Sequence, residues 1–253
     1  KPDLKGRVDI LKVHAKNVRM DETVDLDAIG LATSGAVGAD LANMINEAAI
    51  LAVKQGRKAI SQADLFESVE VVIAGKEKKD RILSAVKKKT VAYHEVGHAL
   101  ITALEKNAEP VQKITIVPRT MGSLGYVMQV PEEEKYLETK DELLAKITTY
   151  MAGRAAEILL YGDKAGNNTG ASSDIKQARY FMKASLNEYA MGDKLYARWT
   201  PDEIEAEMKA QYQRTCQMIR ENRTVLDALT DRLAENKSMD QTQLEAFFRE
   251  SGI

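Results

Sequence analysis

The stretch TVAYHEVGHAL, residues 90–100, constrains this chain more than any other. Its mostly apolar residues favour a buried helix, and a helix turns by about 100° per residue. His94 and His98 therefore stand one turn apart on nearly the same face, where both imidazoles can reach one small cation. Glu95 lies beside them, close enough to reach a water on that cation without being a ligand, and Gly97 leaves room beside the cation. The spacing predicts a metal site.

Composition bounds what else the chain can be. At 253 residues, with 44% hydrophobic and 29% charged residues, we expect a soluble globular protein of one large or two modest domains. A net charge of -2 gives no field that would make nucleic acid a partner. The single cysteine, Cys216, excludes an internal disulfide and a cysteine-rich zinc cluster, and we expect a core thiol. The only histidines are His14, His94 and His98, so two of three at ligand spacing favour a metal site over a chance match.

The lengths of the apolar runs and the residues at the N-terminus bear on membrane insertion and secretion. No run of about 18 apolar residues occurs, so we expect no segment that spans a bilayer. The N-terminus lacks the apolar core of a signal peptide and does not begin with Met. The sequence is therefore expected to be a piece of a longer protein.

Residues 1–77 form the first predicted domain, a small helical bundle. Apolar residues recur at helical spacing, Gly56 is a plausible helix C-cap, and Ser61 with Asp64 resembles a capping box. The charge-rich segment 74–90 is expected to be a solvated linker or an exposed helix.

Residues 78–253 form the second predicted domain, a mostly helical one with a small β-sheet. The helix with the two histidines is followed by two β-type runs and then by further helices that begin with capping boxes at Thr139 and Thr200. The predicted strands cover 111–119 and 122–131, a loop covers 162–173, and the helices after the loop cover 174–192, 200–236 and 240–248. The fold class is therefore mainly α with a small sheet.

Two histidines and a glutamate at this spacing are typical of H-E-x-x-H zinc hydrolases, in which the glutamate takes a proton from the zinc-bound water. Such a zinc usually has three protein ligands. Because His14 is in the other domain, we expect the third ligand to be a carboxylate.

Three carboxylates compete for this position. Glu157 lies on a helix, where an ion pair with Arg154 is a plain alternative, and Glu188 follows further along the chain. Asp174 enters the first turn of a helix after a glycine-containing loop, where the helix N-terminus favours an ionised carboxylate. Its alternative role is helix capping. Chemistry alone favours Asp174 and leaves the other two open.

Six motifs of the second domain occur in the order of a known family: TVAYHEVGHAL, VQKITIVPR, LGYV, AGRAAEILLYG, TGASSDIKQAR and MGDKL. On these motifs the chain resembles the FtsH family of membrane-anchored ATP-dependent zinc metalloproteases. The resemblance implies a zinc metallopeptidase domain with one Zn²⁺ per chain. It implies that His94, His98 and Asp174 are zinc ligands and that Glu95 is the catalytic glutamate.

The first domain resembles the helical lid of an AAA+ ATPase module, through PDLKGRVDILKVHAKNV and GAVGADLANMINEAAILA. This resemblance implies that His14, Gly38 and Ala39 lie near the adenine of a bound nucleotide. Their alternatives are an interfacial helix residue for His14 and a turn residue for Gly38. The chain has no G-x-x-x-x-G-K-[ST] phosphate loop, so we expect no ATP hydrolysis by it alone, with ATP or ADP bound only in the full-length parent.

The resemblance also implies a homo-hexameric parent that degrades unfolded and membrane proteins. This part would lie on the cytoplasmic side, soluble in itself, with membrane contact only through a missing N-terminal segment. The edge of the sheet near residues 111–130 either receives an extended substrate or is scaffold. Two alternatives remain: a catalytically inactive interaction or regulatory module with the same fold, and a metal hydrolase that acts on something other than peptides.

Overall fold

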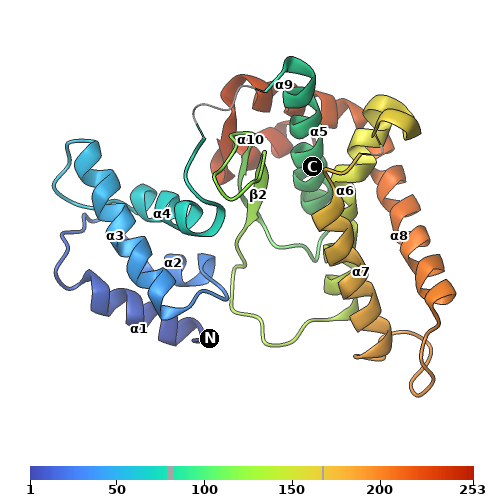
Figure 1. The fold of residues 1–253 in the computed structure, drawn as a ribbon, viewed down its shortest axis with the longest axis horizontal. Helices are drawn as coiled ribbons and strands as arrows, with labels where there is room; N and C mark the ends of the chain where they lie inside the picture. The colour runs from blue at the N-terminus through green and yellow to red at the C-terminus, as the bar shows by residue number, and fades with distance from the viewer. Residues whose placement is uncertain (79–82, 167) are drawn as a thin grey trace. The chain divides into compact units, whose positions relative to one another are not determined.

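A computed structural model describes residues 1–78, 83–166 and 168–253 (Figure 1). Residues 79–82 of the predicted linker and Asn167 of the predicted loop lie outside the described residues. The chain divides into two compact units. The first comprises Lys1–Arg81, Pro118–Ser123 and Val130–Lys135, and the second comprises Ile82–Val117, Leu124–Gln129 and Tyr136–Ile253.

The first unit is a helical bundle in its described part. Its helices are α1 (Leu4–Ala15), α2 (Leu26–Ala32), α3 (Gly38–Lys54) and α4 (Gln62–Ala74). They bury one apolar side each, and the fully buried side chains include Leu11, Ile29, Leu41, Met44 and Leu65. The predicted helical bundle is confirmed.

The start of α4 follows from the capping box expected at its N-terminus. The Ser61 hydroxyl accepts a hydrogen bond from the Asp64 N–H, and the Asp64 carboxylate accepts one from the Ser61 N–H. Arg57 adds two contacts of 2.6 Å to the same carboxylate. Gly56 has a φ of 73° just after α3, as a helix-ending glycine requires.

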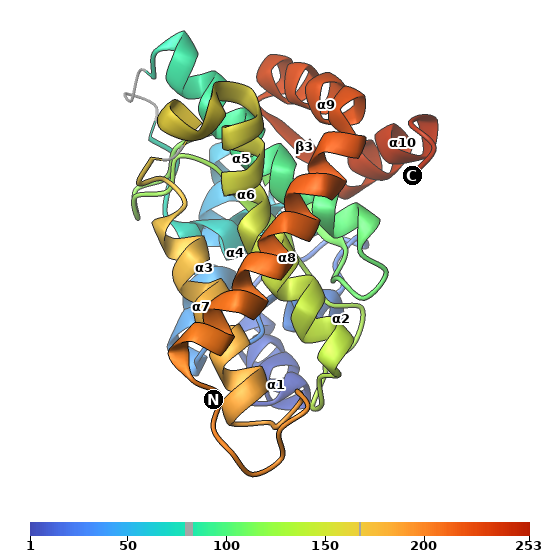
Figure 2. The same cartoon turned by 90° about the vertical axis from the view of Figure 1, so that its right-hand side faces the viewer.

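The second unit contains the remaining helices of the described chain. They are α5 (Ala85–Leu104), α6 (Lys140–Gly166), α7 (Ser172–Asn187), α8 (Pro201–Glu221), α9 (Arg223–Asn236) and α10 (Gln241–Glu250). Helix α6 is central, because α5, α7 and α8 all pack against it, and Figure 2 shows α7 and α8 running beside it. Within the described residues, no helix is both long and apolar enough to cross a membrane.

A three-stranded antiparallel sheet in the order β2-β1-β3 completes this unit. The strands are β1 (Val111–Thr115), β2 (Tyr126–Gln129) and β3 (Ser238–Asp240). Ile114 lies at the centre of the sheet, opposite Val127 on one side and Met239 on the other. The sheet confirms the predicted fold class. Its strands β1 and β2 are shorter than the predicted runs, and β3 was not predicted because three residues are too few to show alternation.

Several predicted element boundaries are wrong. The helix predicted over 174–192 is α7, which ends at Asn187. The single helix predicted over 200–236 is two helices, which meet at Asn222, where the side-chain amide donates to the Met218 carbonyl at 2.9 Å and the backbone leaves helical geometry. The loop predicted from residue 162 begins later. At Gly162 (φ 74°) the helix kinks, and helical turns then continue to Gly166.

The core of the second unit forms around α5. Its apolar residues pack with those of α6, α9, α10 and β1, and Val96, Leu100 and Ile101 are almost completely buried. Gly97 belongs to this packing. A Cβ added there would lie 2.8 Å from both the Ala152 carbonyl oxygen and the Ala156 Cβ, so glycine lets α6 approach α5 closely. The prediction that Gly97 leaves room beside the metal is therefore replaced by a role in helix packing.

Candidate metal centre

His94 and His98 project from the buried middle of α5, one turn apart. Their Nε2 atoms lie 3.1 Å from each other, and the two rings meet edge to face at 77°. His98 is 8% exposed and His94 is partly buried. Both imidazoles therefore direct one nitrogen toward a shared point.

Asp174 reaches the same point from the first turn of α7. Its Oδ2 atom lies 3.3 Å from the His94 Nε2 and 3.9 Å from the His98 Nε2. Burial favours the neutral acid, but the hydrogen bond with His94 and the charges of both histidines lower the pKa of Asp174 below its usual value. The carboxylate is therefore ionised, as a metal ligand must be.

The three donor atoms fit a small tetrahedral cation. In the part of the chain that the structure describes, His94, His98 and Asp174 form the one group of three or more potential ligands, with donor atoms all within 4.8 Å of one another. Zn²⁺ with bonds of 2.0–2.1 Å separates tetrahedral ligand atoms by about 3.3–3.4 Å. The observed separations of 3.1, 3.3 and 3.9 Å bracket this distance. Two imidazoles and one carboxylate also make a donor set that suits Zn²⁺.

The other ring nitrogen of each histidine has a fixed partner. The His94 Nδ1 lies 2.6 Å from the Oε1 of Glu157, and the His98 Nδ1 lies 2.7 Å from the Thr149 carbonyl oxygen. Because both partners are acceptors, each Nδ1 carries the proton and donates it, which leaves each Nε2 free to bind a cation.

The surroundings of the two imidazoles shift their pKa values in opposite directions. Burial opposes charge on His94, but hydrogen bonds with Asp174 and Glu157 and the charge of Glu95 raise the pKa of His94 to about 10. Burial, together with the charge of His94, lowers the pKa of His98 to about 4. A bound cation would take the place of the proton on His94.

Glu95 is 7% exposed and lies against the start of β2. A Cβ added at Gly125 would come within 2.9 Å of the Glu95 Oε1, so a larger residue there would displace the carboxylate. Burial, with the charges of Asp174 and Glu157, raises the pKa of Glu95 to about 7, although His94 opposes the shift. A carboxyl group with such a pKa can both accept and release a proton near neutral pH.

Gly153 provides the room beside the histidines. A Cβ at this position of α6 would lie 2.4 Å from the Cε1 of His94 and 2.7 Å from its Nε2. Since real Cβ contacts are longer, any side chain here would force the imidazole to move. Sequence periodicity did not reveal this role, because it depends on which face of α6 meets α5.

Glu157, weighed from the sequence as a possible third ligand or ion-pair partner of Arg154, is instead the partner of the His94 Nδ1, a role that the sequence did not predict. It is 2% exposed, holds His94 with one oxygen, and accepts a hydrogen bond from the Asn168 side-chain amide with the other. The sequence carried a signal for it, because a carboxylate inside the apolar run AAEILL needs a buried partner.

Other candidate residues lie apart from this group. Glu188 is exposed at the end of α7, and Cys216 is half-buried against the core of the second unit, where burial raises the pKa of its thiol. In the first unit, His14 is exposed near the end of α1, while Gly38 and Ala39 open α3.

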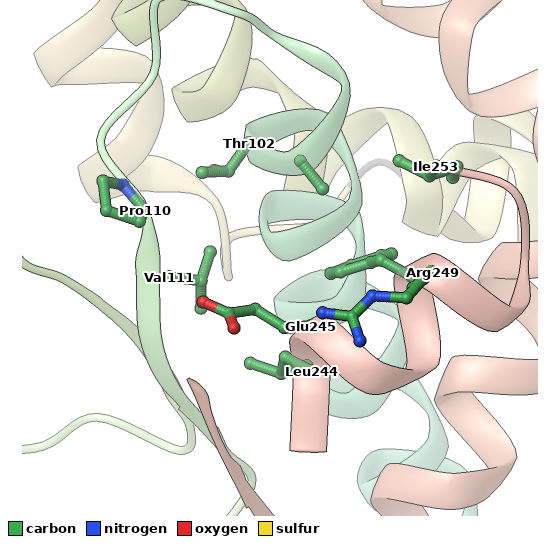
Figure 3. A pocket seen from close by; sticks show the side chains of 9 residues that line it. Thr102, Pro110, Val111, Leu244, Glu245, Arg249 and Ile253 are labelled. Carbon is green, nitrogen blue, oxygen red and sulfur yellow. The ribbon is translucent and has the colours of Figure 1, made fainter. Parts of the chain in front are cut away.

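A pocket of about 350 Å³ lies between α5, β1 and α10 (Figure 3). Thr102, Val111, Leu244 and Arg249 are among the residues that line it. None of the candidate metal-centre residues is in its wall, so the pocket is separate from the metal centre.

Comparison with known proteins identifies the family to which the chain is similar. The sequence profile of peptidase family M41 matches residues 81–203, and that of the AAA+ lid domain matches residues 23–67. Three relatives bear the name ATP-dependent zinc metalloprotease FtsH or FtsH 1. They come from Clostridium perfringens (45% identical over 94% of the chain), Lancefieldella parvula (43% over 94%) and Methylacidiphilum infernorum (39% over 97%).

The chain spans about two fifths of the length of these relatives, covering 36%, 40% and 42% of them. Both matched regions appear in the order lid then peptidase. The chain therefore belongs to the FtsH family, with an AAA+ lid in residues 23–67 and an M41 peptidase domain in residues 81–203.

Proposed function

We propose that this chain is a zinc-dependent endopeptidase, the proteolytic part of an ATP-dependent protease. The observation that carries the proposal is the convergence of the His94 Nε2, the His98 Nε2 and the Asp174 carboxylate beside the buried Glu95. The M41 match and the names of the relatives support the same reaction class.

In this proposal His94, His98 and Asp174 would hold Zn²⁺. When bound, the ion supplies a Lewis acid for the scissile carbonyl and lowers the pKa of a water to about 7. Glu157 and the Thr149 carbonyl keep both Nδ1 atoms protonated, so that both Nε2 atoms face the ion.

Glu95 is the general base and then the general acid. Its carboxylate accepts a proton from the attacking water as the oxygen–carbon bond to the peptide carbonyl forms. It then passes that proton to the amide nitrogen as the carbon–nitrogen bond breaks. The position of Glu95 one residue after His94 brings it beside the reacting atoms without making it a ligand.

The proposal extends to the longer protein of which this chain forms two units. In it, a membrane-anchored homo-hexamer uses ATP to deliver unfolded and membrane proteins to the peptidase domain on the cytoplasmic side. His14, Gly38 and Ala39 then lie near the nucleotide. The names of the relatives, which include the words ATP-dependent, support this extension.

Zinc content and cleavage of an unfolded, carboxymethylated protein test the proposal. The wild-type chain should bind one zinc and cleave the substrate, whereas Glu95→Gln should keep the zinc and lose the cleavage. Glu188→Gln, which changes an exposed glutamate just after α7, is the matched control and should match wild type.

Three outcomes would contradict the proposal. A Glu95→Gln variant as active as wild type would exclude the assigned base. A wild-type chain without zinc and without activity would favour a regulatory module, and hydrolysis of small esters alone would favour a hydrolase that does not act on peptides.

A further inference from the structure

Asn168 lies in the short connection between α6 and α7, shortly before Asp174. Its backbone and its side chain are both held by α6. The Arg154 Nη2 donates to the Asn168 carbonyl oxygen at 2.5 Å, and the Asn168 side-chain amide donates to the Oε2 of Glu157. Two residues one turn apart on α6 therefore hydrogen-bond to the backbone and to the side chain of Asn168.

The same side chain also shapes the turn toward Asp174. Its Oδ1 accepts a hydrogen bond of 2.7 Å from the Gly170 N–H, which closes a tight turn just before α7 begins. A Cβ at Gly170 would lie 2.9 Å from this Oδ1 and 3.7 Å from the Oε1 of Glu157. The chain therefore passes close to Glu157 shortly before it reaches Asp174, the third candidate ligand.

We propose that Asn168 is a positioning residue that links the loop carrying Asp174 to the Glu157–His94 pair and thereby increases the affinity of the centre for zinc. The inference rests on the proposed zinc centre. It adds a route by which ligands from two distant parts of the chain are held together: His94 through Glu157, and Asp174 through the turn that Asn168 closes.

The alternative is that Asn168 only shapes a surface turn. Two substitutions separate these roles. In Asn168→Ser the hydroxyl can still accept from the Gly170 N–H, as serine does in such turns, but it is too short to reach Glu157. Asn168→Ala removes both hydrogen bonds. A link to Glu157 predicts that both variants bind zinc more weakly than wild type, whereas a role in the turn alone predicts that the serine variant resembles wild type.

The test measures zinc affinity by competition with a chelator, together with the absorption spectrum of the cobalt-substituted protein. We expect Asn168→Ser and Asn168→Ala to bind zinc about tenfold more weakly, the lower end of the usual cost of losing a partner of a metal ligand. The cobalt spectrum should change, since the ligand geometry changes. Thr169→Ala, at the exposed neighbouring residue, is the control and should leave both unchanged.

A double-mutant cycle with Glu157→Gln shows whether Asn168 acts through Glu157. In the Glu157→Gln background, Asn168→Ser should weaken zinc binding less than twofold further, because the link is already broken. In the metal-free protein, the nitrogen NMR signal of the His94 Nδ1–H should shift in Asn168→Ser, a readout that needs no zinc.

Unchanged zinc affinity, cobalt spectrum and His94 signal in Asn168→Ser would overturn the inference, as would full additivity with Glu157→Gln. Failure of the zinc proposal looks different, because then the wild-type protein itself binds no stoichiometric zinc or cleaves no peptide. A variant that unfolds is recognised by its metal-free melting temperature. If Asn168→Ser unfolds, the double-mutant cycle of Asn168→Ala with Glu157→Gln decides the question, because full additivity there would overturn the inference.

Discussion

The Nδ1 of His94 lies 2.6 Å from the Oε1 of Glu157, so a carboxylate of α6 fixes the orientation of an imidazole that α5 presents. This contact joins residues that are far apart in sequence and buries the charge of Glu157 beside a donor. It makes the candidate metal centre depend on how α5 and α6 pack as well as on the histidine spacing.

Asp174→Asn should weaken zinc binding by about 100-fold or more, beyond the 10–100-fold that loss of an outer partner costs. The amide keeps the shape of the side chain but removes the charge, and asparagine is a poor zinc ligand. Chelator competition measures the change. Glu188→Gln removes a charge from the exposed end of the same helix and should bind zinc like wild type. Equal affinity in the two variants would remove Asp174 from the ligand set.

Gly153→Ala should impair zinc binding even though alanine stabilises a helix by about 1 kcal/mol relative to glycine. The new Cβ would stand 2.4 Å from the His94 Cε1, so the imidazole must leave its position. Gly38→Ala is the control, because within the described residues the nearest atom to its Cβ would be the Ile10 Cδ1, at an ordinary contact distance of 3.9 Å. Zinc titration of both variants tests this, and normal affinity in Gly153→Ala would show that His94 can move without loss.

Zinc affinity should rise with pH from acid through neutral values and level off toward pH 10. The partners of His94 raise its pKa to about 10, so in the metal-free protein His94 carries a proton at pH 7 that zinc must displace. Binding at pH 7.5 should therefore release about one proton, and lower pH should favour the proton over the metal. Calorimetry in buffers with different ionisation enthalpies measures the release. Zinc binding without proton release would contradict this assignment.

Asp64→Asn should destabilise the first unit by about 1–3 kcal/mol at pH 7, the cost of weakening a buried hydrogen-bonded carboxylate. The hydrogen bond from Arg57 lowers the pKa of Asp64 below its usual value, despite burial. A carboxyl group whose pKa is lower in the folded state stabilises the folded protein fully at pH values above its unfolded pKa of about 3.9. This stabilisation is lost as the pH falls through the folded-state pKa.

The difference between wild type and Asp64→Asn should therefore be complete at pH 7 and shrink below about pH 4. Urea unfolding at several pH values measures it, with Asp9→Asn on exposed α1 surface as the control. A difference that stays constant down to pH 2 would mean that packing, and not the carboxylate charge, explains the loss.

Local patterns in the sequence determined much of the fold. The boxes at Ser61, Thr139 and Thr200 predicted where helices begin, because a cap is satisfied by residues three positions away. The break at Asn222 and the strand Ser238–Asp240 could not be predicted in this way. A three-residue strand carries no periodic signal, and it forms because β1 supplies its hydrogen-bond partners.

The same distinction between local sequence patterns and tertiary packing applies to the metal centre. The sequence alone determined that His94 and His98 share a helix face and that Glu95 lies beside them, since helix geometry relates residues within one turn. It left Asp174, Glu157 and Glu188 as competing carboxylates. Tertiary structure decided that Asp174 meets the histidines, that Glu157 orients His94 and that Glu188 stays exposed. These outcomes depend on the packing of α5, α6 and α7, which brings together side chains that no local spacing relates.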